Sequence, residues 1–187
     1  MDQAIFQHFQ NHIQTTMAVG ENCAQSISMA ADKLASTLIN GNTIFSCGQG
    51  HSLPLSQLLV TYLTCGYQIE RPRFPAIELE GLTAGNQQPG SYASSLSLHG
   101  HSDDALIVFG IGNNNQALQQ AIAAANEKGM LVILLSASND DLLVKELSDN
   151  DIEIPTAESE QWTSISASFL ILQCLCTLID NIIFGGD

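Results

Sequence analysis

Positively charged residues are scarce in this chain. Its 187 residues contain five Lys and Arg against 19 Asp and Glu, which gives a formal net charge of −14 at pH 7. Such a surface repels phosphate backbones, so direct binding to DNA or RNA is not expected. Eight of the acids lie between Asp140 and Glu160, where Lys145 is the only base. That stretch is either a solvated acidic face or a docking surface for a basic partner.

Charged residues of both signs together make up only 13% of the chain, whereas 45% of it is hydrophobic. This balance indicates that another copy of the chain covers part of the apolar surface. No C-x-x-C pair is present, and the number of cysteines is odd. We therefore expect reduced, buried thiols in a cytoplasmic protein. The cysteines are Cys23, Cys47, Cys65, Cys174 and Cys176.

Signals for export or membrane insertion are also missing. The N-terminal stretch "MDQAIFQHFQNHIQTTM" has no basic segment of the kind that begins a signal peptide. The longest apolar stretch, Phe169 to Phe184, is interrupted by Gln173, Asp180 and Asn181. No membrane span is therefore expected.

The order of apolar patterns predicts an α/β fold. Apolar residues at helical spacing predict two helices, over 5–17 and 21–39, separated at Gly20. From Thr43 onward, short apolar runs alternate with helical patterns. Near-continuous Val, Ile and Leu runs indicate strands covered on both faces, hence one domain with a doubly wound parallel sheet. Strands are predicted at 43–48, 74–79, 104–112, 130–136 and 151–154, helices at 53–65, 115–128, 140–147 and 164–183, and a loop at 81–90.

In a doubly wound sheet, ligands bind at the carboxyl ends of the strands, where this sequence places a glycine turn. In "CGQGHS", Gly48 and Gly50 permit a tight turn, and the N–H groups that begin the next helix can hold an anion. Gln49 and His51 lie in the same turn; His51 either acts as an acid or base or points into solvent. Ser52 either adds a hydroxyl to the anion site or caps the helix.

The second loop at this edge runs from Gly110 to Asn115. Asn113, Asn114 and Asn115 can cap the following helix and bond neighbouring backbone, but they bring no positive charge. Neither loop contains Lys or Arg. A phosphate there would rest on backbone N–H groups alone.

No catalytic constellation appears among the remaining histidines and the single tryptophan, and no metal or cofactor is expected. His99 and His101 could hold a metal, but a β-hairpin or a pair of loops is favoured for this stretch. His8 and His12 share a helix face, which indicates surface or subunit packing. Trp162 is either a lid on the core or an anchor at an interface.

Three segments together resemble the sugar isomerase (SIS) domain over nearly the whole chain: "CGQGHS", "YQIERPRFPAIEL" and "QCLCTLIDNIIF". Within that family the chain is similar to the phosphoheptose isomerase branch, and above all to members that associate with the replication initiator DnaA. The resemblance implies a flavodoxin-like three-layer domain that forms a homotetramer. It also implies that residues 1–40 take part in oligomerisation.

The same resemblance implies that the catalytic groups are lost. The isomerases carry a histidine and a glutamate on the helix after the glycine loop, and a glutamine and a histidine on the last helix. The matching positions here hold Leu58, Tyr62, Ile165 and Gln173. Leucine and isoleucine neither bind metal nor transfer protons, so isomerase activity is not expected.

The end of the last helix matches the partner-contacting positions of the DnaA-associating members. Ile183 and Phe184 occupy these positions, although they could instead complete the core face of the helix. The expected function is to bind a DnaA-type initiator as a homotetramer and promote chromosome replication, without contacting nucleic acid or membrane. The alternatives are a phosphosugar-binding regulatory protein and a residual phosphoheptose isomerase.

Overall fold

A five-stranded parallel sheet lies at the centre of the computed structural model, which describes residues 2–79, 91–112, 116–137, 141–156 and 161–185. The strand order is β2-β1-β3-β4-β5, and every neighbouring pair is parallel. This is the flavodoxin-like order, which confirms the predicted doubly wound fold. The strands are β1 (Ile44–Gly48), β2 (Ala76–Glu78), β3 (Ala105–Gly110), β4 (Leu131–Ser136) and β5 (Ile152–Pro155).

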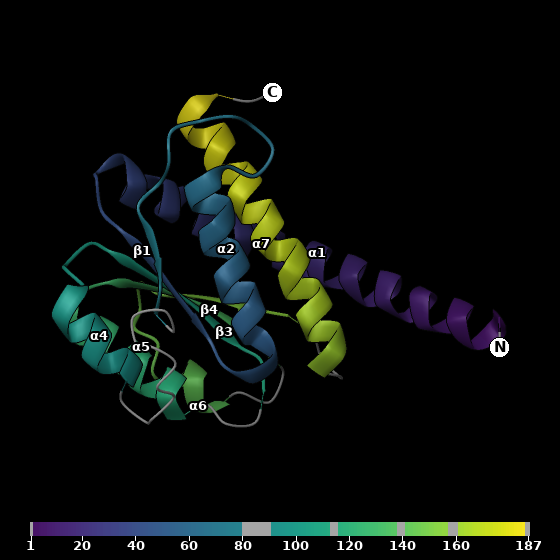
Figure 1. The fold of residues 1–187 in the computed structure, drawn as a ribbon. Helices are drawn as coiled ribbons and strands as arrows, with labels where there is room; N and C mark the ends of the chain where they lie inside the picture. The colour runs from purple at the N-terminus through teal and green to yellow at the C-terminus, as the bar shows by residue number, and fades with distance from the viewer. Residues whose placement is uncertain (1, 80–90, 113–115, 138–140, 157–160, 186–187) are drawn as a thin grey trace.

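Helices cover both faces of the sheet and form three layers with it (Figure 1). Alternate strand residues point to opposite faces, so Ile107 and Phe109 join one core while Leu106 and Val108 join the other. The first core is closed by α1 (Asp2–Ile39), α2 (Leu53–Cys65) and α7 (Gln161–Phe184). The second is closed by α4 (Ser91–His99), α5 (Gln116–Lys128) and α6 (Asp141–Val144).

The prediction of two separate N-terminal helices is wrong, because α1 runs unbroken through Gly20. A glycine inside a helix costs about 1 kcal/mol relative to alanine but does not end the helix. Gly20 is not among the glycines with positive φ, and its neighbours Val19 and Cys23 are buried in the core. The N-terminal half of α1 projects away from the domain (Figure 1).

A helix stands where the sequence favoured a hairpin or loops. α4 ends at His99, and His101 follows it on an exposed turn. Only Tyr92 and Leu96 of α4 are buried, and serines fill much of the rest, so its apolar periodicity is weak. The predicted loop at 81–90 lies outside the described residues.

The expectation that all the cysteines are buried is also wrong. All five thiols are free, as expected, but Cys65 and Cys174 are exposed. Both lie on helix faces that the core does not cover, whereas Cys23, Cys47 and Cys176 are buried.

Within the described part of the chain, one helix, Trp162–Phe184 in α7, is long and apolar enough to cross a membrane by length and composition. Core helices pass the same test. Here Leu172, Leu175, Cys176 and Ile179 are buried against the sheet and α1, as expected for a core helix.

Candidate functional site

The two loops predicted to form a site do start side by side. β1 lies between β2 and β3, and Gly48 pairs in register with Phe109, one residue before β3 ends at Gly110. The chain therefore leaves both strands at the same edge, at the point where the strand order reverses. That is where a doubly wound sheet binds its ligands.

The hydroxyl of Ser52 connects these two loops. It lies 2.8 Å from the Phe109 carbonyl oxygen and 3.0 Å from that of Gln49, and it accepts a hydrogen bond from the Gln49 N–H. Ser52 is fully buried, and its hydroxyl makes no capping bond to α2. The side chain thus holds the turn against β3 and is not directed toward a ligand.

Close packing and backbone geometry explain the glycines at this edge. A Cβ on Gly48 would stand 2.6 Å from the Ser52 carbonyl oxygen, and one on Gly110 would stand 2.7 Å from a methyl of Leu143. Gly50 has a φ of +60°, in the left-handed region that favours glycine. Gly48 and Gly50 are therefore required by the backbone of the turn, whether or not a ligand binds, whereas a side chain at Gly110 would require the ends of Leu143 and Leu134 to move.

The described exposed side chains beside this edge include one aromatic pair. His51 is exposed, in the short 3₁₀ turn Gly50–Ser52, and its ring centroid lies 5.0 Å from that of Trp162 at the start of α7. Trp162 is 57% exposed, so it is not a lid on the core. Asn113, Asn114 and Asn115 lie outside the described residues.

The positions matched to catalytic groups lie on the facing helices α2 and α7. Leu58 and Tyr62 on α2, and Ile165 on α7, are partly buried and pack against the core. The Tyr62 ring also lies 4.6 Å, centroid to centroid, from that of Tyr67. Gln173 is partly buried on α7. Three of these four side chains thus pack against the core.

No group of three or more His, Cys, Asp or Glu in the described residues is arranged to hold a metal ion. Burial, helped by the nearby Glu78 carboxylate, raises the pKa of the Cys47 thiol in β1. That thiol is therefore protonated and unreactive at neutral pH.

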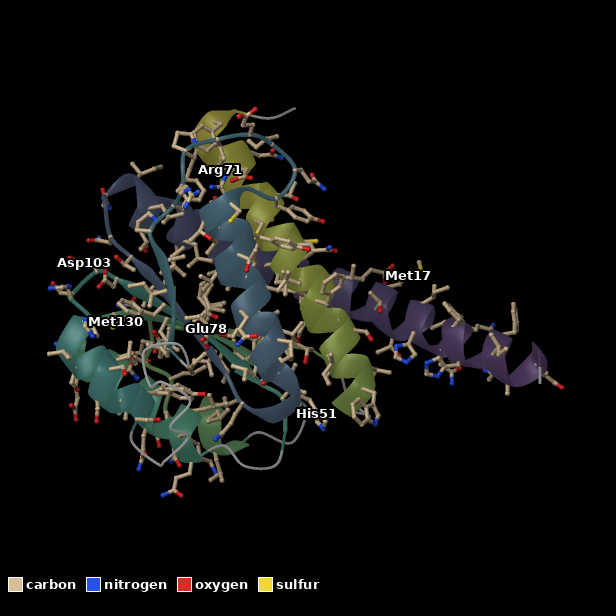
Figure 2. The ribbon with its side chains drawn as sticks, viewed as in Figure 1. Met17, His51, Arg71, Glu78, Asp103 and Met130 are labelled. Carbon is tan, nitrogen blue, oxygen red and sulfur yellow. The ribbon has the colours of Figure 1, made fainter. Side chains whose placement is uncertain are left out.

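An open cavity of about 690 Å³ lies at the other edge of the sheet, away from the glycine turn. It is lined by residues near the amino ends of the strands, among them Asn42, Asp103, Met130 and Asp151. Figure 2 shows Asp103 and Met130 on the side of the molecule away from His51. The cavity is therefore separate from the loops described above.

A buried ion pair near the end of α7 was not expected from the sequence motifs. Arg71, in the loop after α2, donates from Nε to Asp180 Oδ1 at 2.6 Å, and both side chains are at least 95% buried. Figure 2 shows His51 and Arg71 at opposite ends of α7. The pair joins the "ERP" and "LIDN" segments of the sequence, which lie 109 residues apart.

The two residues expected to contact a partner lie three and four positions after Asp180. Ile183 is partly buried and packs against the core, whereas Phe184 is 44% exposed. The Phe184 ring stacks on that of Phe74, with centroids 5.9 Å apart. Ile183 therefore matches the core interpretation more closely, and Phe184 the exposed one.

Comparison with known proteins agrees with this geometry. The family model of the SIS domain matches residues 7–137. The chain belongs to the SIS-domain family. The phosphoheptose isomerase of Francisella tularensis has the same fold, with a TM-score of 0.89 and 28% identity over 96% of this chain and 97% of that one. The Neisseria gonorrhoeae phosphoheptose isomerase shares the fold at 19% identity, with a TM-score of 0.85 over 96% of this chain and 98% of that one.

Other proteins similar to this chain are named DiaA and not phosphoheptose isomerase. The DnaA initiator-associating protein DiaA of Edwardsiella ictaluri is 33% identical over 183 residues, 94% of this chain and 93% of that protein. DiaA of Escherichia coli (strain HS) is 31% identical over 191 residues, 98% of this chain and 97% of that protein. This SIS-domain chain therefore resembles DiaA proteins in sequence along nearly its whole length.

Proposed function

We propose that this chain is a single, non-catalytic SIS domain over residues 1–187 that binds a DnaA-type initiator. As a cytoplasmic homotetramer it would gather several initiator molecules and so promote the start of chromosome replication. The observation that carries the proposal is that Leu58, Tyr62 and Ile165 pack against the core closed by α1, α2 and α7. The partner is proposed from the similarity of this chain to DiaA proteins along nearly its whole length.

Assembly into a homotetramer is supported by the projecting half of α1. Its large apolar side chains recur on one side of the helix and are more than half exposed in a single chain. Soluble monomers rarely leave such an apolar stripe exposed to solvent. We therefore infer that a second copy of the chain covers it. These residues are Ile5, Phe6, Phe9, Ile13 and Met17.

A phosphosugar-binding regulatory protein is the second candidate, and its support is the position of the glycine turn at the ligand edge. The turn offers little to a phosphate, because the Ser52 hydroxyl and the N–H groups of Gln49 and Ser52 bond within the protein. Thermal unfolding with a panel of sugar phosphates tests this candidate, since a bound ligand raises the melting temperature. The proposal expects no shift.

Turnover of a heptose phosphate, with and without zinc, tests the absence of catalysis. The Francisella tularensis isomerase serves as the positive control. We expect no product, because Leu58 and Ile165 supply neither a metal ligand nor a proton donor. Measurable turnover would instead support the alternative that this protein is a residual phosphoheptose isomerase.

Phe184→Ala tests the binding surface. The variant is expected to bind the initiator at least tenfold more weakly while keeping the wild-type oligomer, since truncating a central aromatic contact costs roughly 2 kcal/mol or more. Leu98→Ala is the control, because Leu98 is 76% exposed on α4, in the opposite layer. Equal losses in both variants, or dissociation of the oligomer by Phe184→Ala, would contradict the assignment.

A further inference from the structure

The Arg71 guanidinium is bound to the ends of two helices at once. It donates to the carbonyl oxygens of Leu63 (2.8 Å) and Tyr62 (3.0 Å), in the last turn of α2, and to Asp180 in α7. Carbonyl groups at the end of a helix carry partial negative charge, and these two also accept from the N–H groups of Gly66 and Phe74. Arg71 therefore neutralises the end of α2 and fixes the end of α7 beside it.

The guanidinium also packs on an aromatic ring. Its Cζ atom lies 3.8 Å from the centroid of Phe74, a distance at which a cation is attracted to the π face. Phe74 is partly buried against the core, and its ring is nearly parallel to that of Phe184, with 16° between the planes. Contacts thus continue from buried Arg71 through Phe74 to exposed Phe184.

The backbone at Phe184 is fixed as well. Gly185 has a φ of +74° and donates to the Asn181 carbonyl oxygen at 2.9 Å, the usual way in which a glycine ends a helix. Phe184 is consequently the last helical residue, and helix ends fray unless they are held. Here the Asp180–Arg71 pair lies one turn earlier, and the ring stack lies at the end itself.

We propose that Arg71 and Phe74 are positioning residues for the partner contact of Phe184. The proposal rests on the proposed function and adds to it that the aromatic anchor is held in one orientation before the partner arrives. A side chain that is already ordered loses less conformational freedom on binding, which strengthens binding without a new contact. The partner would present an apolar pocket for one aromatic ring.

The experiment is a double-mutant cycle on initiator binding, using Phe74→Leu, Phe184→Leu and the two together. Leucine keeps an apolar side chain against the core but removes the ring stack. Phe74→Leu is expected to weaken binding about three- to tenfold, the range that corresponds to ordering one side chain. In the Phe184→Leu background the same change is expected to have no further effect, because there is no ring left to position.

Two further variants separate positioning from general destabilisation. Phe74→Tyr keeps the ring and is expected to retain wild-type affinity. Arg71→Lys keeps the charge beside Asp180 but loses the flat guanidinium, so it is expected to weaken binding as Phe74→Leu does. Unfolding is measured for every variant, and affinities are compared under conditions where each remains folded and keeps the wild-type oligomer.

The outcomes distinguish the inference from the function on which it rests. If the wild-type protein fails to bind the initiator, the proposed function fails and the inference falls with it. If the wild type binds but Phe74→Leu binds equally well, only the inference is overturned. Additive losses in the double variant would also overturn it, because they would show that Phe74 acts independently of Phe184.

Discussion

The hydroxyl of Ser52 donates to the carbonyl oxygen of Phe109 at 2.8 Å, across the two loops that leave β1 and β3. From the sequence, this hydroxyl was expected either to bind an anion or to cap α2. In the structure it instead holds the loop after β1 against β3. In this chain the glycine turn and its serine are therefore accounted for by folding alone.

Removing this hydroxyl is expected to destabilise the protein. Ser52→Ala would leave the partly buried Gln49 N–H and the buried Phe109 carbonyl without that partner, which costs about 1–3 kcal/mol. Chemical denaturation measures the change. Ser97→Ala, on an exposed position of α4, is the control and is expected to change stability by less than about 0.5 kcal/mol. Equal effects of the two substitutions would contradict the role given to Ser52.

The Arg71–Asp180 pair predicts a strong asymmetry between single and double substitutions. Arg71→Met leaves the Asp180 carboxylate buried without its partner and is expected to cost about 3–5 kcal/mol. Asp180→Leu added to Arg71→Met removes the stranded charge and is expected to recover part of that loss. Denaturant unfolding of the wild type, Arg71→Met, Asp180→Leu and the double variant measures the coupling. A double variant that is less stable than Arg71→Met would show that the pair is not coupled in this way.

Gly20 offers a test of the unbroken first helix. Gly20→Ala is expected to stabilise the protein by about 0.5–1 kcal/mol, because alanine has the higher helix propensity and its Cβ would meet nothing within 4 Å. Gly41→Ala is the matched control: its surroundings are equally open, but its φ of +81° disfavours a side chain. That control is expected to lose about 1 kcal/mol. A loss of stability at Gly20 would indicate a break in the helix there.

The cysteines are expected to differ in reactivity. Near neutral pH, a thiol reagent should label exposed Cys65 and Cys174 first. Burial raises the pKa of Cys176 to about 12, and burial also raises the pKa of Cys23 and Cys47, so few of these thiols are ionised. Mass spectrometry of labelled peptides identifies the sites. Rapid labelling of Cys47 or Cys176 in the folded protein would contradict the described burial.

The strands and their edge were predictable because local signals are strong there. "MLVILLS" lacks any competing helical pattern and forms β4, and parallel strands must place Gly48 and Gly110 at one edge. The helix α4 was missed because only Tyr92 and Leu96 mark its buried face. Gly20 was misread because its cost to a helix is smaller than the stabilisation that core packing on its C-terminal side supplies.

The details of the candidate sites could not be read from local patterns. The hydroxyl of Ser52 has several partners within reach in any turn, and which it takes depends on how β3 lies beside it. Arg71 and Asp180 are 109 residues apart, so only the folded chain shows that they meet. The exposure of Phe184, in contrast to Ile183, depends on where α7 ends relative to the core.

Calorimetric titration of the purified protein with the N-terminal domain of its own organism's DnaA tests the central claim most directly. Binding through the end of α7 predicts saturable heat with about one site per subunit, since every chain carries one such surface. A folded tetramer that gives no heat and forms no complex with the initiator would contradict it.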